Sequence, residues 1–288
     1  MEQGVIIKGI SGFYYVKCGT NVVTCTARGV FRNLGVTPIV GDYVTFERHA
    51  SGNAQINAVL PRRNTLVRPY VANIDILGIV VSASVPEPDW MLIDKLLISA
   101  QCASIRPVLI LNKIDAASTA TKQFMADYFG FTCLNVSAQT GQGMEELKDL
   151  IGSNIFCLAG QSAVGKTSIL NSLLPNADFA IGELSRKTER GKHTTRVAQL
   201  IPFGDGAILD TPGFSFFDTE YLTTEQLDAC YPEFLQAQGC RYSGCRHISE
   251  PDCGVKELLT CGKMSTARYQ RYVIISKENE MRRKHRYD

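Results

Sequence analysis

Hydrophobic and polar positions alternate over short segments in the first 62 residues, with glycine, asparagine and proline between them. Alternation of this kind, without a helical period, predicts strands with one buried face. The predicted strands cover residues 5–10, 14–18, 22–27, 42–48 and 55–59. Five short strands favour a small closed barrel, and an OB-like barrel is one such fold. We therefore predict an N-terminal all-β domain over residues 1–62.

Between residues 76 and 209, uninterrupted apolar runs alternate with segments of helical period. The apolar runs predict buried strands over 76–84, 108–111, 132–136, 155–159, 197–201 and 207–209. The helical segments lie at 90–103, 122–129, 144–151 and 166–174. This alternation predicts a doubly wound α/β domain. We expect this domain to span residues 63–215. A linker-like stretch at 61–69 marks its boundary with the barrel.

From residue 216 the strand pattern ends, and short helical pieces precede a final helix predicted over 265–286. The segment between Cys240 and Cys253 is polar and carries cysteine and histidine where a hydrophobic run would otherwise form a core. These features predict a mostly helical domain over 216–288. The fold class is therefore multidomain, with an all-β barrel, a central α/β domain and a helical C-terminal domain.

Composition excludes several classes of protein. With 288 residues, 45% hydrophobic and 20% charged, the chain fits neither a disordered nor a collagen-like class. The longest uncharged apolar run, residues 76–85, falls short of the roughly 20 residues that a membrane-spanning helix needs. The N-terminus lacks the basic start and apolar run of a secretory signal. We therefore expect a cytoplasmic protein that does not contact membranes.

Basic residues concentrate at the two ends of the chain, although the net charge is only +2. Residues 1–62 hold six Lys or Arg against three Asp or Glu, and residues 263–288 hold eight against three. Such ends either contact a polyanion or form a solvated charged face. Aromatic residues near the barrel arginines suit a surface that stacks bases and pairs with phosphates. The candidate RNA contacts are Arg28, Arg32, Arg48, Arg282, Arg283 and Lys284.

A phosphate-binding motif follows the strand predicted at 155–159 and opens a predicted helix, which is the setting that a P-loop requires. The glycines let backbone N–H groups close around phosphates at the helix N-terminus. Lys166 neutralises the β- and γ-phosphate oxygens and supports catalysis, and the Thr167 hydroxyl ligates Mg²⁺. The motif fits G-x-x-x-x-G-K-[ST] and comprises Gly160, Gln161, Ser162, Ala163, Val164, Gly165, Lys166 and Thr167, followed by Ser168.

Two upstream motifs indicate that the base is guanine. Asn112, Lys113 and Asp115 belong to an N-K-x-D sequence after a predicted buried strand. The Asp115 carboxylate can accept hydrogen bonds from guanine N1–H and the exocyclic amine, and a site built for those bonds rejects adenine strongly. Asn112 would support the loop, and the stem of Lys113 would lie across the base. Ser137 and Ala138 supply the short loop that commonly cradles guanine.

Two further motifs lie downstream of the P-loop. Asp210 and Gly213 belong to a D-x-x-G sequence, in which the aspartate holds Mg²⁺ through water and the glycine N–H contacts the γ-phosphate. The polar loop 190–196 stands where a switch segment supplies a threonine to Mg²⁺, and either Thr194 or Thr195 fits that role. Together the motifs complete the set of a Mg²⁺-dependent GTPase that binds GTP and GDP.

The order of these motifs is permuted. A Ras-like GTPase begins with the P-loop and ends with N-K-x-D and S-A, whereas here Asn112 and Ser137 precede Gly160. The sequence therefore predicts a circularly permuted G domain. Because all the loops still lie at the carboxyl ends of a parallel sheet, the site can assemble unchanged. The segment after D-x-x-G then leads directly into the C-terminal domain.

Phe214 occupies the position after D-x-x-G, where Ras-type enzymes have the glutamine that orients the attacking water. Another group must orient that water, or a partner must assist. We predict His193, in the switch loop, as the catalytic group. The alternative is that His193 is an exposed loop residue without a role.

Cys240, Cys245, His247 and Cys253 place three thiolates and an imidazole within a short polar segment. This spacing predicts one structural zinc ion, because four protein ligands leave no open position for catalysis. The ion would supply folding energy in place of a hydrophobic core. Cys261 is a possible substitute ligand, and disulfides or free thiols are the alternative. The other cysteines are expected to be buried small side chains; they are Cys18, Cys25, Cys102, Cys133, Cys157 and Cys230.

The combination resembles the RsgA (YjeQ) family of bacterial small-ribosomal-subunit biogenesis GTPases. The resemblance covers nearly the whole chain and includes residues 27–32 and 40–42 of the barrel besides the nucleotide and cysteine motifs. It implies a factor that binds the 30S subunit through 16S rRNA, hydrolyses GTP slowly alone and faster on the subunit, and helps late assembly. We expect it to act as a monomer. One departure is Ala163, where the family usually has glycine, so a positive φ there would strain the backbone.

Two other hypotheses stay open. The first is an RNA- or ribosome-binding module whose nucleotide site is a sensor with negligible turnover, an alternative that Phe214 keeps open because the water-orienting glutamine is absent there. The second is a signalling GTPase that acts on proteins, for which the basic ends would be dispensable.

Overall fold

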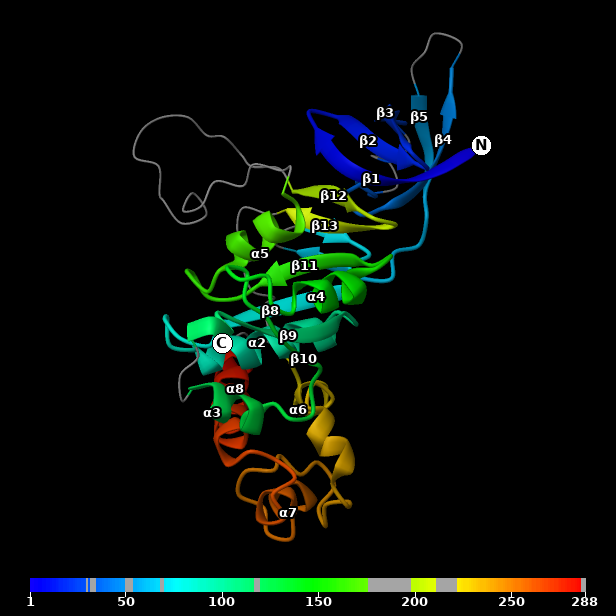
Figure 1. The fold of residues 1–288 in the computed structure, drawn as a ribbon. Helices are drawn as coiled ribbons and strands as arrows, with labels where there is room; N and C mark the ends of the chain where they lie inside the picture. The colour runs from blue at the N-terminus through cyan, green and yellow to red at the C-terminus, as the bar shows by residue number, and fades with distance from the viewer. Residues whose placement is uncertain are drawn as a thin grey trace, which may run out of the picture.

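The computed structural model describes residues 1–29, 31, 35–49, 54–67, 70–116, 120–175, 198–210 and 222–285. Figure 1 shows the barrel at one end, a sheet with helices in the middle, and the helical C-terminal part at the other end. The N-terminus lies at the barrel end, and the last helix runs back toward the middle of the molecule. Within the described ranges, none of the helices has the length and apolar character needed to cross a membrane.

Five strands form the predicted barrel. They are β1 (Glu2–Ile10), β2 (Phe13–Cys18), β3 (Asn21–Ala27), β4 (Tyr43–Arg48) and β5 (Ala54–Val59). Their order is β1-β2-β3-β5-β4, and pairing of β4 with β1 closes the barrel. β3 and β5 are parallel, and the other neighbours are antiparallel. Alternate side chains fill the interior, among them Ile6, Val16 and Phe46, each fully buried. This arrangement confirms the OB-like barrel.

The central sheet continues from the barrel in the order β10-β9-β8-β11-β13-β12. Its strands are β8 (Ile76–Ser82), β9 (Arg106–Asn112), β10 (Cys133–Asn135), β11 (Ile155–Ala159), β12 (Gln199–Phe203) and β13 (Gly206–Asp210). All are parallel except β12, which runs antiparallel to β13. Pairing of Lys8 in β1 with Gln199 in β12 joins barrel and sheet into one eleven-stranded sheet.

Helices cover both faces of the central sheet, as the apolar strands require. On one face α2 (Trp90–Cys102) and α3 (Ala120–Asp127) pack against side chains such as Leu77 and Leu109. On the other face α4 (Met144–Ile151) and α5 (Lys166–Leu173) pack against a second cluster that includes Val80, Ile110 and Phe156. All seven residues of β8 are buried. The prediction of a doubly wound α/β unit is confirmed.

The stretch predicted as a linker is instead a short hairpin. Strands β6 (Thr65–Val67) and β7 (Tyr70–Ala72) pair with each other. Arg62, just before the hairpin, donates from Nε to Asp42 Oδ1 at 2.7 Å, and the Asp42 side chain is fully buried. Arg63 likewise pairs with Asp75 at 2.5 Å, so two arginines hold the start of this segment against carboxylates of the protein.

The C-terminal part is helical, as predicted, and docks on α2 and α3. Its elements are α6 (Thr224–Asp228), the 3₁₀ helix η3 (Pro232–Gln236), α7 (Gly254–Thr260) and α8 (Thr266–His285). Arg268 and Arg271 of α8 both pair with the fully buried Asp94 of α2. Tyr128 also donates from its hydroxyl to Asp94, at 2.9 Å. Removing one partner of such a buried ionic cluster is costly, so the cluster holds α8 against α2.

Candidate functional site

The P-loop turns sharply between β11 and α5, and two glycines permit the turn. Gly160 has φ of +133° and Gly165 has φ of +98°. A Cβ at Gly160 would lie 2.3 Å from the carbonyl oxygen of Val80, and one at Gly165 would lie 2.3 Å from Asn112 Nδ2. Only glycine fits both the backbone conformation and the space. The loop therefore delivers its backbone N–H groups to the N-terminus of α5, where anions bind.

Lys166 begins α5 and folds over the loop. Its Nζ donates to the carbonyl oxygens of Gly160 at 2.7 Å and Gln161 at 2.6 Å. Burial lowers the pKa of Lys166 below its ordinary value, because desolvation penalises the charged form. A partly desolvated ammonium group at the mouth of this loop is suited to pairing with phosphate oxygens.

Asn112, at the end of β9, joins three of the predicted motifs. Its Nδ2 donates to the carbonyl oxygen of Val164 in the P-loop at 2.9 Å, and its Oδ1 accepts from the backbone N of Ala138 at 3.2 Å. The asparagine side chain is almost completely buried. The structure therefore brings N-K-x-D, S-A and the P-loop together at the carboxyl ends of neighbouring strands, where ligands of open α/β sheets bind.

Lys113 and Asp115 are held in place by the same loops. Lys113 adopts φ of +65°, and its Nζ donates to the carbonyl oxygen of Ala163 at 2.8 Å. Asp115 Oδ1 accepts from the hydroxyl of Ser137 at 2.5 Å, and the Ser137 oxygen also accepts from the backbone N of Thr140. The serine of the S-A loop thus orients the carboxylate that is predicted to read the base.

The predicted magnesium and switch residues are only partly described. Asp210 ends β13, which pairs with the P-loop strand β11, and Thr167 lies in the first turn of α5. Ala163 has φ of +64°, the left-handed conformation in which alanine carries strain. Five predicted residues lie outside the described part of the chain: Arg32, His193, Thr194, Thr195 and Gly213.

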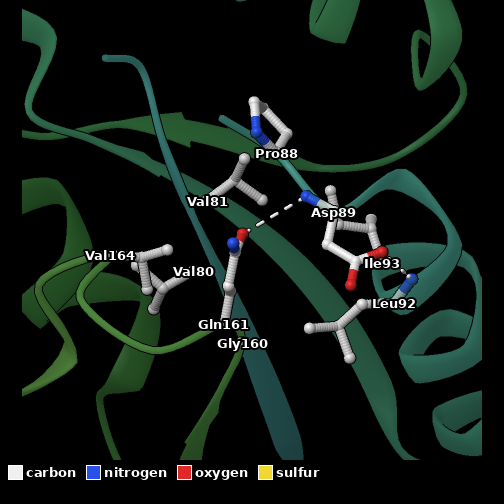
Figure 2. Close-up of a pocket in the computed structure, with 9 residues that line it drawn as sticks. All are labelled: Val80, Val81, Pro88, Asp89, Leu92, Ile93, Gly160, Gln161 and Val164. Carbon is white, nitrogen blue, oxygen red and sulfur yellow. Dashed lines mark hydrogen bonds between the residues drawn. The ribbon is translucent and has the colours of Figure 1, made fainter. Parts of the chain in front are cut away.

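A small pocket borders the P-loop on the side of α2, and Figure 2 shows the side chains that line it. Gln161 points across this pocket, and its Oε1 accepts from the backbone N of Asp89 at 3.2 Å. Asp89 also caps α2, since its Oδ1 accepts from Leu92 N at 2.9 Å. This contact between the P-loop and α2 was not predicted from the sequence, although an aspartate before an apolar helix is a recognisable N-cap.

The four predicted metal ligands converge in the C-terminal part. The donor atoms of Cys240, Cys245, His247 and Cys253 lie within 4.8 Å of one another. Two sulfurs each bound at about 2.3 Å to a tetrahedral zinc ion would lie about 3.8 Å apart, and Cys240 Sγ lies 3.8 Å from Cys253 Sγ. His247 Nδ1 lies 3.5 Å and 3.3 Å from these sulfurs. The residues therefore fit one zinc ion, and Cys261 is not a member of the group.

Residues around the cluster orient its ligands. His247 Nε2 lies 3.2 Å from Asp228 Oδ2, and Tyr272 donates from its hydroxyl to Asp228 Oδ1 at 2.7 Å. A carboxylate behind a ligating histidine fixes the ring and its tautomer. Burial by itself raises the pKa of the Glu250 carboxyl. Hydrogen bonds from the backbone N–H groups of Arg246, Ile248 and Ser249 outweigh this effect and lower the pKa to about 2. Neither Asp228 nor Glu250 was predicted from the sequence to support the metal ligands.

The candidate RNA contacts do not gather in one patch. Arg28 donates to Gln55 Oε1 at 3.1 Å, and Arg48 pairs with Glu2 at 2.8 Å, both on the barrel. Arg282, Arg283 and Lys284 lie near the end of α8, away from the barrel. Lys284 pairs with Glu280 at 3.0 Å.

The expectation that the remaining cysteines are buried is wrong for Cys102. This residue is exposed because it is the last residue of α2, where the helix leaves the core. Cys25, Cys157 and Cys230 are buried, whereas Cys18 and Cys133 are half-buried.

A P-loop on a central parallel strand, with the N-K-x-D and S-A loops supplied from earlier in the chain, defines the class of circularly permuted P-loop GTPases. The model of the RsgA GTPase family matches residues 59–220, and that of the RsgA N-terminal domain matches residues 3–56. The chain belongs to the RsgA GTPase family and is a GTP hydrolase.

Relatives in both sequence and structure span the whole chain. The small ribosomal subunit biogenesis GTPase RsgA of Ruminiclostridium cellulolyticum is 42% identical over 287 residues, which cover 96% of this chain and 93% of the relative. That of a Geobacillus species is 38% identical over 290 residues, covering 98% and 99%. The crystal structure of YjeQ from Thermotoga maritima superimposes with a TM-score of 0.84 at 33% identity, covering 96% and 98%. YloQ, described as a circularly permuted GTPase, gives 0.83 at 29% identity, covering 98% and 96%.

Proposed function

We propose that this GTPase binds the 30S ribosomal subunit through contacts with 16S rRNA and assists its late maturation in the cytoplasm, hydrolysing GTP faster when it is bound. The observation that carries the GTP-hydrolysing part of the proposal is the joining of the N-K-x-D, S-A and P-loop motifs through Asn112. Relatives named for small-subunit biogenesis, similar over the whole chain, support the choice of partner. We further propose that the protein acts as a monomer of three domains over residues 1–62, 63–215 and 216–288.

The nucleotide site would read guanine with Asp115 and bind phosphates with the P-loop. Asp115, held by Ser137, would accept from the guanine N1–H and amine. Gly160 to Ser168 would surround the phosphates, with Lys166 against the β and γ oxygens and Gly213 at the γ-phosphate. Phosphate oxygens would take the place of the loop carbonyl oxygens to which Lys166 Nζ donates in this structure.

Mg²⁺ would be held by Thr167, by Asp210 through water, and by Thr194 or Thr195. When bound, the ion neutralises charge on the β- and γ-phosphates during transfer. For catalysis we propose Lys166 as the charge partner of the phosphates and His193 as the group that orients the attacking water. His193→Ala should therefore reduce subunit-stimulated hydrolysis while nucleotide affinity is unchanged, and equal stimulated rates would exclude His193 from this role.

We propose that one zinc ion binds Cys240, Cys245, His247 and Cys253 and has a structural role, since all four positions come from the chain. The spacing of the sulfur and nitrogen atoms supports tetrahedral coordination. A chelator should unfold the chain beyond about residue 230 while GTP binding persists. If the full helical content remains without metal, the ion is not structural.

The barrel and the end of α8 are the proposed rRNA surfaces. Phe13 and Tyr43 are 51% and 42% exposed on the barrel, which leaves their rings available for stacking on bases. Arg28, Arg32 and Arg48 would contact phosphates there, and Arg282, Arg283 and Lys284 at the other end. Sedimentation of the chain with purified 30S subunits, with a non-hydrolysable GTP analogue or with GDP, tests the proposal. Co-sedimentation with the analogue is expected, and its absence would overturn it.

A further inference from the structure

Two cysteines from distant parts of the chain meet where the C-terminal part docks on the central sheet. The sulfur atoms of Cys102 and Cys230 lie 3.1 Å apart, although the residues are separated by 128 positions in the sequence. Cys102 is the last residue of α2, and Cys230 comes two residues after the end of α6. Both therefore sit at the ends of elements, where side chains adjust most easily. A disulfide needs a sulfur separation of about 2.05 Å, so the two sulfur atoms would have to approach by about 1 Å to form one.

The two thiols differ in accessibility and reactivity. Cys102 is exposed, whereas Cys230 is only 3% exposed, and the single S–H of Cys230 has two acceptors within reach, the Cys102 sulfur at 3.1 Å and the carbonyl oxygen of Gln226 at 3.2 Å. The hydrogen bond with Cys230 lowers the pKa of the Cys102 thiol, and the same bond raises that of Cys230. Thiolate is the reactive form. Cys102 is thus the thiol that a reagent in solution reaches and that reacts first, and Cys230 lies behind it.

We propose that Cys102 and Cys230 form a reversible disulfide that tethers the C-terminal part to α2, with a low-molecular-weight disulfide of the glutathione class as oxidant. The Cys102 thiolate attacks one sulfur of the external disulfide, forms a mixed disulfide and releases one small thiol. Cys230 then attacks the Cys102 sulfur, forms the internal bond and releases the second small thiol. Two protein thiols are oxidised, one external disulfide is reduced, and the two protons end on the released thiols.

The position of this bond gives it a mechanical consequence. Along α2, Asp89 at the first end contacts Gln161 of the P-loop, Asp94 pairs with Arg268 and Arg271 of α8, and Cys102 forms the other end. The ionic contacts can break and re-form, whereas a covalent bond at Cys102 holds the C-terminal part on the same helix. Oxidation would therefore restrict movement between that part and the sheet that carries the P-loop. The disulfide would have this effect whichever partner the protein binds.

The test uses the metal-loaded, full-length protein treated with oxidised glutathione, followed by alkylation, proteolysis and mass spectrometry. We expect a peptide pair linked through Cys102 and Cys230, a loss of two thiols from the ten cysteines, and unchanged zinc content. A dithiol reductant should restore both thiols. Because this experiment maps the bond in the natural sequence, it does not depend on the folding of a variant.

Cysteine variants test whether the bond forms between these two residues. Cys102→Ser and Cys230→Ser should each abolish the internal bond, and Cys230→Ser should leave a stable mixed disulfide at Cys102. Cys261→Ser, which removes another exposed thiol, should form the bond as the natural protein does. A stable mixed disulfide at Cys102 in the natural protein, or oxidation confined to Cys240, Cys245 and Cys253 with release of zinc, would overturn the proposal.

Discussion

Asn112 donates a hydrogen bond of 2.9 Å to the backbone carbonyl of Val164, and so connects the predicted base-recognition loop to the P-loop. Asn112→Ala would remove this donor and also the acceptor of Ala138 N. An unsatisfied buried polar group costs about 1–3 kcal/mol. We expect GTP affinity to fall about tenfold or more, measured by titration with a fluorescent GTP analogue.

Asn135→Ala is the matched control, because Asn135 is an exposed asparagine at the end of the neighbouring strand β10. The Asn135→Ala variant should bind GTP with the affinity of the natural protein. If Asn112→Ala also bound GTP normally, Asn112 would not organise the nucleotide site.

Asp115→Asn should change the preferred base. The amide that replaces the carboxylate would donate to a base with an oxygen at position 2, so preference should move from GTP toward XTP. Competition of the two nucleotides for binding measures this change. Asp149→Asn, at an exposed aspartate of α4, should leave the preference for GTP unaltered. A variant at Asp115 that still prefers GTP would contradict the guanine assignment.

Ala163→Gly should stabilise the protein, because φ of +64° strains alanine and suits glycine. The left-handed conformation costs a non-glycine residue about 1–2 kcal/mol, and the added freedom of glycine in the unfolded chain offsets about 0.4–1 kcal/mol of this. The two ranges leave a net gain of between about 0 and 1.6 kcal/mol in the free energy of unfolding, which urea denaturation measures. Ala116→Gly, at an exposed position without positive φ, should instead destabilise. Equal losses for both variants would exclude strain at Ala163.

Asp228→Asn tests the residue behind the metal ligand His247. Loss of the carboxylate that faces Nε2 should weaken zinc binding by about 10- to 100-fold, as second-layer changes typically do. Competition with a chromogenic chelator measures the affinity. Asp252→Asn is the control, since Asp252 adjoins the ligand Cys253 but pairs with Arg241 at the surface. Zinc affinity that is the same in both variants would mean that Asp228 does not support the site.

The local pattern of the sequence was sufficient for the main elements. Alternation predicted the barrel strands, because burial of one face makes every second residue apolar. Unbroken apolar runs predicted β8 and β11, because both faces of these strands are buried. The P-loop was equally visible, since phosphate binding needs glycine at Gly160 and Gly165 in a fixed spacing. Most of the missed contacts join residues far apart in the chain, which a local pattern of hydrophobic and polar residues does not record.

Arg268 shows what the local sequence pattern cannot predict. The sequence placed it in a basic end that either contacts a polyanion or is solvated, yet its side chain is 1% exposed and pairs with Asp94, 174 positions away. Part of the basic excess after Lys263 is therefore neutralised inside the protein. Asp228 was missed for the same reason, since it precedes its partner His247 by 19 positions. The β6–β7 hairpin was not predicted, because the arginine and proline residues of the segment 61–69 are typical of a linker.

GTP hydrolysis by the full-length protein, measured with and without purified 30S subunits, tests the central claim most directly. Large ribosomal subunits at the same concentration and Asp115→Asn with 30S subunits serve as controls. We predict a rate that rises with the concentration of 30S subunits and saturates, with no such rise in either control. A rate that 30S subunits leave unchanged, or that large subunits raise equally, would contradict the account.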